Sequence, residues 1–143
     1  MNQRVVTGGF IVSNNKFLLV KRADNDTFYP GVWEIPGGKL EFGEATETGL
    51  RRELKEEVGL EVEIISPISV WDYTNQENST QYVEIDFLCK YKGDSKVIIS
   101  EEHSDFKWVT FDELDNFDIS PPAKQLLLSL KNHPLILSAF KAV

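Results

Sequence analysis

The chain has 143 residues, of which 41% are hydrophobic and 27% charged, so we predict one globular domain over residues 1–143 and not a disordered chain. Its 15 Lys and Arg against 23 Asp and Glu give a net charge of −8, which disfavours nucleic acid and anionic membranes as partners. No apolar run approaches the ~20 residues of a membrane span, and the single Cys89 excludes an internal disulfide framework, so we expect a cytoplasmic protein.

The chain is expected to begin with a β-hairpin. Residues 4–12 and 16–21 are apolar and rich in side chains that favour strands. Between them, Asn14 and Asn15 tolerate the positive φ angles that a tight turn requires. The pattern therefore predicts two antiparallel strands joined at these asparagines.

A long loop and a helix are predicted next. Residues 23–36 contain several Pro and Gly residues among polar ones and predict a loop, with a short extended piece at 32–35. Residues 46–58 have helical character, and Gly59 can end that helix in the left-handed conformation.

The second half returns to strands. β-Branched and aromatic residues predict strands at residues 61–65, 68–73, 82–91 and 105–109. A short helical turn follows at 111–114, and a second main helix runs from Pro121 to about Leu130, where His133 and Pro134 break it. Strands interleaved with two main helices predict an α/β fold, a mixed sheet with helices on its faces.

Three carboxylates are predicted on one face of the first helix. Glu53, Glu56 and Glu57 have the i, i+3, i+4 spacing, while Leu50, Leu54 and Val58 lie on an adjoining face that can pack on the sheet. Such a cluster is either a solvated helix face or a set of ligands for a hard cation such as Mg²⁺ or Mn²⁺. Only two histidines are present and neither has a zinc-like spacing.

The segment around this helix resembles the Nudix box. Gly38 is followed after five residues by Glu44 and after seven more by RELKEEVGL at 52–60, and every defined position of the box is filled. The resemblance extends to most of the chain. It implies a Nudix-type α/β/α sandwich with a mixed β-sheet between helices, and hydrolysis of nucleoside diphosphates linked to another moiety.

The resemblance also implies roles for individual residues. The residues that match divalent-cation ligands are Glu53, Glu56 and Glu57, joined by the backbone carbonyl of Gly38. Glu44 and Arg52 match the pair that orients the loop and the helix. By their spacing alone, these two would be ordinary surface charges.

Features outside the box resemble the MutT branch, which acts on nucleoside triphosphates. Residues 32–39, VWEIPGGK, are similar to that branch's loop into the box, and Lys39 would add positive charge at the phosphates. Arg22 matches a position that contacts substrate phosphate. Glu102 matches a loop carboxylate that is a metal ligand or general base, with Glu101 as its rival. His103 beside it is expected at the surface or in loop packing.

The segment Pro-Pro-Ala-Lys at 121–124 departs from the pattern of that branch. There, Pro-Pro-Ala-Asn carries an Asn that reads an oxidised guanine base, whereas this chain has Lys124. An amide both donates and accepts hydrogen bonds, but an ammonium only donates. Lys124 therefore remains a candidate substrate-binding residue, while recognition of oxidised guanine is not implied.

The predicted function is that of a Mg²⁺-dependent pyrophosphohydrolase, with Mn²⁺ as a possible replacement. It would cleave a (deoxy)nucleoside triphosphate to the monophosphate and pyrophosphate, with Glu53, Glu56 or Glu102 as the general base. The alternatives are an ADP-ribose or dinucleoside polyphosphate hydrolase, or a nucleotide-sensing module without activity. The partner is a nucleotide, and the protein is expected to be a monomer or homodimer.

Overall fold

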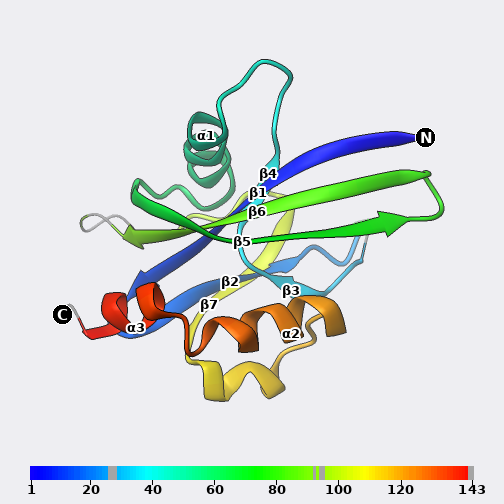
Figure 1. The fold of residues 1–143 in the computed structure, drawn as a ribbon. Coiled ribbons are helices and arrows are strands. Elements are labelled where there is room, and N and C mark those ends of the chain that lie inside the picture. Colours follow the sequence, from blue (N-terminus) through cyan, green and yellow to red (C-terminus); the bar gives the residue numbers. More distant parts are fainter. Residues whose placement is uncertain (26–28, 92, 94–95, 142–143) are drawn as a thin grey trace.

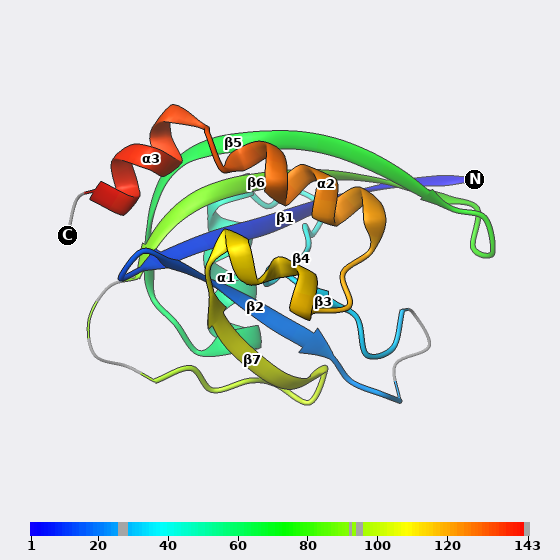
Figure 2. The same ribbon diagram turned by 90° about the horizontal axis from the view of Figure 1, so that it is seen from below.

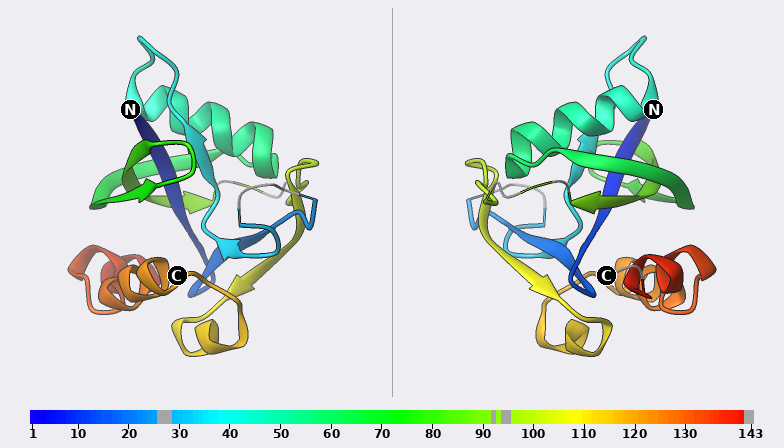
Figure 3. Two further views of the ribbon diagram at one scale, coloured as in Figure 1. Left: turned by 90° about the vertical axis from the view of Figure 1, so that its right-hand side faces the viewer. Right: turned by 90° about the vertical axis from the view of Figure 1, so that its left-hand side faces the viewer.

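The computed structural model describes residues 1–25, 29–91, 93 and 96–141. A mixed β-sheet lies between two layers of helices (Figures 1 and 3). Helix α1 (Thr46–Val58) covers one face, and helices α2 (Pro121–Leu130) and α3 (Pro134–Lys141) cover the other. The predicted α/β sandwich is confirmed.

The sheet contains one parallel pair among antiparallel neighbours. Its strands are β1 (Asn2–Ser13), β2 (Lys16–Arg22), β3 (Trp33–Glu34), β4 (Gly37–Lys39), β5 (Val62–Asn75), β6 (Thr80–Tyr91) and β7 (His103–Val109). The order is β3-β2-β1-β6-β5, with β4 paired to β1 and β7 paired to β2. Strands β1 and β6 run parallel over their whole pairing, so the sheet is mixed.

Each face of the sheet has its own hydrophobic core. Leu50, Leu54 and Val58 of α1 are fully buried and pack on one face, as their spacing predicted. On the other face, Phe10 and Phe17 stack with ring centroids 4.6 Å apart, beneath α2, α3 and the 3₁₀ helix η1 (Phe111–Asn116) (Figure 2). The outer layers therefore hold the sheet from both sides, with α1 alone on its face.

Turn and cap residues behave as the sequence predicted. Asn14 and Asn15 have φ angles of 51° and 63° in the β1–β2 turn. Gly59, with φ of 70°, ends α1 in the left-handed conformation and its N–H bonds to the Lys55 carbonyl. These positive φ angles cost little for Gly and Asn, which is why local sequence identifies them.

Two segments differ from the sequence prediction. The two strands predicted at 61–65 and 68–73 are one strand, β5 (Val62–Asn75), because register shifts on either side of Pro67 absorb the proline within an edge strand. The second main helix ends at Leu130 as predicted, but a further helix that the sequence did not predict, α3, begins at Pro134, where His133 Nδ1 accepts a hydrogen bond from the Leu135 N–H at 3.1 Å. Proline suits a first helical position, which is why α3 can begin at this residue.

A buried carboxyl pair, absent from the sequence predictions, links β6 to β5. The Trp71 indole N–H lies 3.0 Å from Glu84 Oε2 and 3.1 Å from Asp86 Oδ2, and Ser69 also donates to Asp86. Burial, together with the neighbouring carboxyl, raises the pKa of Glu84 well above its usual value, and burial raises the pKa of Asp86. The contacts join the two strands through side chains as well as through the backbone.

No helix among the described residues is long and apolar enough to cross a membrane.

Close backbone contact between β4 and β1 requires glycine at position 37. A Cβ atom there would overlap the Thr7 carbonyl oxygen and lie 2.8 Å from the Gly8 Cα. At Gly38 a Cβ would instead meet the carboxylate of Glu53, which is the end of a flexible side chain. At Gly37 the atoms in the way belong to the backbone of β1, which cannot rotate aside as the Glu53 side chain can.

We therefore predict that Gly37→Ala lowers the free energy of unfolding by about 3 kcal/mol, the upper range for overpacking a tight site. Gly38→Ala is the matched control and should cost clearly less, because Glu53 can rotate away. Urea denaturation of the two variants measures the difference. Equal losses would mean that β4 moves freely on β1.

Candidate active site

Arg52 joins the loop before α1 to the helix. Its Nε and Nη2 donate to the two carboxylate oxygens of Glu44 at 2.8 and 3.0 Å, a bidentate pair. The side-chain hydrogen bonds from Arg52, and then the Glu41 backbone N–H, lower the pKa of Glu44 to about 2. Arg52 therefore ties the loop to the helix, and the orienting role that the box resemblance implies for the pair stays a prediction.

The same guanidinium contacts two of the predicted metal ligands. Arg52 Nη1 lies 3.0 Å from Glu53 Oε1 and 3.3 Å from Glu56 Oε2. Glu53 packs directly against Gly38, where a Cβ would overlap its carboxylate. Burial raises the pKa of Glu53 despite the hydrogen bond from Arg52. The Glu53 carboxylate and the Gly38 backbone are therefore neighbours, as a shared cation would require.

Glu57 is the buried member of the three, whereas Glu56 is exposed. Its Oε2 lies 2.8 Å from His103 Nδ1, and the Ser100 hydroxyl donates to it at 3.3 Å. Burial acts to raise the pKa of Glu57, but contacts with His103, Glu102 and Ser100 outweigh it, and the pKa is lowered. Glu57 is thus buried but surrounded by polar groups that favour its charged form.

The loop that carries Glu102 is held on the end of α1 by backbone hydrogen bonds. Ile98 N–H donates to the Val58 carbonyl at 2.9 Å, and Ser100 N–H donates to the Glu57 carbonyl at 3.0 Å. The hydrogen bond with Glu57, and then burial, raise the pKa of Glu102 to about 7. Glu102 therefore contacts Glu57, although both Glu102 and its neighbour Glu101 are exposed.

Arg22 and Lys39 lie on strands that border these carboxylates. Arg22 Nη1 lies 3.3 Å from Glu34 Oε2, and Arg22 is paired in register with His103. Lys39 Nζ lies 5.8 Å from the centre of the Tyr82 ring. Both cations project from strand ends next to Gly38 and Glu102, so their predicted contact with substrate phosphate stays a prediction that the placement allows.

Lys124 lies in a different environment. It stands in the first turn of α2, and its ammonium forms an ion pair with Asp115 of η1. Binding a substrate through Lys124 would require that pair to open or to be shared. The predicted role of Lys124 stays a prediction.

His103 and Glu34 are the residues that sequence reasoning missed. His103 was expected at the surface or in loop packing, but its side chain is only 4% exposed and contacts Glu57. Its Nε2 lies 3.8 Å from Glu34 Oε2. Burial acts to lower the pKa of His103, but Glu34 and Glu57 outweigh it and raise the pKa to about 9. These contacts join distant segments, so no local spacing could have indicated them.

The donor chemistry of this site suits a hard divalent cation. Glu53, Glu56, Glu57 and Glu102 offer carboxylate oxygens, and the Gly38 carbonyl adds another oxygen. Among the described residues, no group of three or more acidic, His or Cys side chains is already arranged around one point. Arg52 and His103 instead neutralise the carboxylates, so cation binding would replace or reorganise those contacts.

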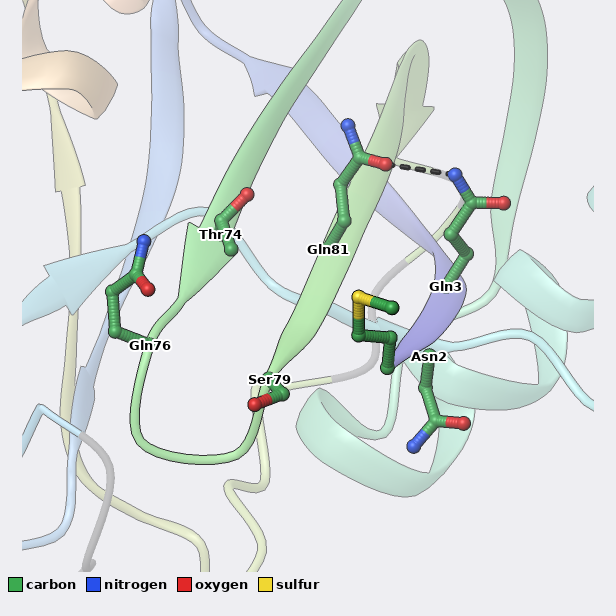
Figure 4. Close-up of a pocket in the computed structure, with 7 residues that line it drawn as sticks. Asn2, Gln3, Thr74, Gln76, Ser79 and Gln81 are labelled. Atoms are coloured by element: carbon green, nitrogen blue, oxygen red, sulfur yellow. Dashed lines mark hydrogen bonds between the residues drawn. The ribbon is translucent and has the colours of Figure 1, made fainter.

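A separate pocket of about 520 Å³ lies where the N-terminal end of β1 meets the β5–β6 hairpin (Figure 4). The residues lining it, whose side chains carry no titratable group, are Met1, Asn2, Gln3, Thr74, Gln76, Ser79 and Gln81. The amides of Gln3 and Gln81 hydrogen-bond to each other at 2.8 Å. This pocket therefore offers hydrogen-bonding groups but no side chain that could act as an acid or base.

Comparisons with known proteins agree with this geometry. The model of the NUDIX domain matches residues 2–130. Nucleoside triphosphatase NudI of Escherichia coli strain K12 is 30% identical over 137 residues, covering 89% of this chain and 96% of that protein. Among solved structures, a MutT NUDIX hydrolase from Burkholderia pseudomallei is similar with a TM-score of 0.75 at 26% identity, covering 90% of this chain and 98% of that one.

A second solved structure extends the likeness of fold. The Escherichia coli ORF135 protein superposes with a TM-score of 0.76 at 23% identity, covering 94% of this chain and 95% of that one. The α/β sandwich and the glutamates of α1, together with these relatives, place the chain among the hydrolases of the Nudix fold. The chain belongs to the NUDIX family, as the family model shows over most of its length.

The Glu44–Arg52 pair predicts a pH-dependent contribution to stability. The folded-state pKa of Glu44 is about 2 against 4.5 for an unperturbed Glu, so the ionised group stabilises the fold above pH 4.5. That contribution is lost as the pH falls from 4.5 towards 2. Glu44→Gln should therefore lower the Tm near neutral pH and leave it almost unchanged in strong acid.

Thermal melts of Glu44→Gln and of wild-type protein across this pH range measure the effect. Glu41→Gln is the control, since Glu41 is exposed and contacts Glu44 through its backbone N–H and carbonyl, which the substitution keeps. A Tm difference that persists unchanged in acid would show that the charge of Glu44 is not the cause.

Proposed function

We propose that this NUDIX hydrolase is a Mg²⁺-dependent pyrophosphohydrolase that converts (deoxy)nucleoside triphosphates to monophosphates and pyrophosphate. The observation that carries the proposal is that the Glu53 carboxylate lies against the Gly38 backbone while Glu57, one turn further along α1, contacts Glu102. The similarity to a protein named nucleoside triphosphatase supports the choice of substrate class.

Residues of this chain supply binding and proton transfer. Arg22 and Lys39 would attract the phosphate chain, because an acidic protein needs local positive charge to hold an anionic substrate. Glu53, Glu56 or Glu102 would take the proton of the attacking water. A pKa of about 7 places Glu102 between its protonated and ionised forms near neutral pH. Mg²⁺, or Mn²⁺ in its place, would neutralise charge that develops on the phosphate oxygens.

The proposal extends to setting and partners. We place the protein in the cytoplasm, as a monomer or homodimer, with a nucleotide as its partner and without nucleic acid. Lys124 would contact an acceptor atom of the base or a phosphate, since an ammonium only donates hydrogen bonds.

Glu57 and the other carboxylates of the box are all present, which favours an active enzyme over a nucleotide-sensing module.

The decisive experiment is a substrate panel. The purified protein is incubated with Mg²⁺ and each of the nucleoside triphosphates, ADP-ribose and dinucleoside polyphosphates, and the products are separated by chromatography. We expect a nucleoside monophosphate and pyrophosphate from the triphosphates. Faster cleavage of ADP-ribose or a dinucleoside polyphosphate would establish the alternative, and no cleavage of any compound would contradict the proposal.

Divalent cations should stabilise the protein. Ligands that bind only the folded state raise its stability by mass action, by about 2.7 kcal/mol at a hundredfold excess over Kd. Mn²⁺ or Mg²⁺ should therefore raise the Tm, and Na⁺ at matched ionic strength should not. An unchanged Tm together with full activity in chelator would contradict a metal-dependent site.

Glu57→Gln should lower kcat at least ~100-fold, equivalent to about 2.7 kcal/mol of barrier. The substitution keeps the size of the side chain but removes the buried charge that His103 and Ser100 contact. Steady-state kinetics measure the loss. Glu47→Gln is the matched control, because Glu47 lies exposed in the first turn of the same helix. Similar losses from both substitutions would refute the assignment of the helix face.

A further inference from the structure

We infer that His103 is a positioning residue that fixes the carboxylate of Glu57 between the metal-binding and phosphate-binding parts of the site, with Glu34 as its second anchor. The inference rests on the proposed function, in which Glu57 binds the cation and Arg22 binds phosphate. It assigns roles to two residues outside the Nudix box.

The imidazole of His103 lies between two carboxylates. Its Nδ1 is 2.8 Å from Glu57 Oε2, and its Nε2 is 3.8 Å from Glu34 Oε2. The His103 side chain is only 4% exposed, and that of Glu57 only 7% exposed. Surrounding atoms therefore restrict both side chains, and the ring acts as a spacer of fixed length between the two acids.

The same Glu34 oxygen continues the connection to Arg22. Glu34 Oε2 lies 3.3 Å from Arg22 Nη1 as well as facing His103. The backbone supports this arrangement, because Arg22 of β2 is paired in register with His103 of β7. Glu57, His103, Glu34 and Arg22 thus form a continuous polar chain that joins α1 to three strands.

A buried carboxylate that binds a cation needs a partner to hold its orientation. Partners of this kind typically contribute about 10- to 100-fold to metal affinity or activity. Ser100 also contacts Glu57, but from a hydroxyl at the longer distance of 3.3 Å. Among the contacts of this carboxylate, the imidazole at 2.8 Å is the closer and more rigid support.

The competing explanation is that His103 has a purely structural role. Two substitutions distinguish this role from the positioning role. In His103→Asn the amide nitrogen takes the place of Nδ1 and can contact Glu57. In His103→Gln the amide reaches the region of Nε2, towards Glu34, and Glu57 loses the contact that the imidazole made. Both variants remove the ring, so a loss caused by packing alone would be shared.

The test is Mn²⁺ titration calorimetry on the substrate-free protein, followed by kinetics. We expect His103→Gln to raise the Kd for Mn²⁺ about tenfold or more, while His103→Asn stays near the wild-type value. His103→Asn should instead raise the KM for the nucleotide more than it lowers kcat, because Glu34 and Arg22 lose their anchor. His133→Gln, which changes the other histidine at the start of α3, should alter neither constant.

Equal changes in Mn²⁺ affinity in both variants, or no change in either, would overturn the inference, as would a wild-type protein that binds no Mn²⁺. A lowered Tm with unaltered Kd would show a structural role only. The proposed function fails separately: wild-type protein that binds Mn²⁺ yet cleaves no nucleotide disproves the activity, while the two Kd values still decide the role of His103.

Discussion

The arrangement of the site depends on one guanidinium. Arg52 binds both oxygens of Glu44, contacts Glu53 and Glu56, and donates to the Lys39 carbonyl at 3.3 Å. Through these contacts a single side chain joins the loop before α1, strand β4 and the helix itself. Planar, bidentate geometry is specific to arginine, and a lysine could not make the same set of bonds.

The second constraint is the concentration of negative charge on a protein that is already acidic. Glu53, Glu56 and Glu57 share one helix, where the charges of Glu57 and Glu56 act to raise the pKa of Glu53, and Glu102 contacts Glu57. Arg52 contacts Glu53 and Glu56, and His103 contacts Glu57, so positive groups lie against each of these carboxylates. A cation that bound here would have to replace or share these internal ion pairs.

Most of the fold could be predicted from the sequence because its turns, helix ends and buried faces are set by residues close together in the chain. The asparagine turn, the left-handed Gly59, the buried stripe of α1 and the Pro-started α2 all depend on neighbours within a few residues. The predictions were incomplete at two prolines. Pro67 lies within one strand because register shifts absorb it, and Pro134 begins α3, a helix that the sequence did not predict.

The sequence by itself determined the family, the carboxylate face and the Glu44–Arg52 pair, since the spacing of the box places these groups on one short segment. Only the tertiary structure decided which carboxylates are buried, and that His103 and Glu34 join Glu57 to Arg22. Those contacts cross between α1, β2, β3 and β7, whose proximity results from strand pairing and not from spacing along the chain. Burial and charge at such junctions are properties of the assembled layers, so no single segment encodes them.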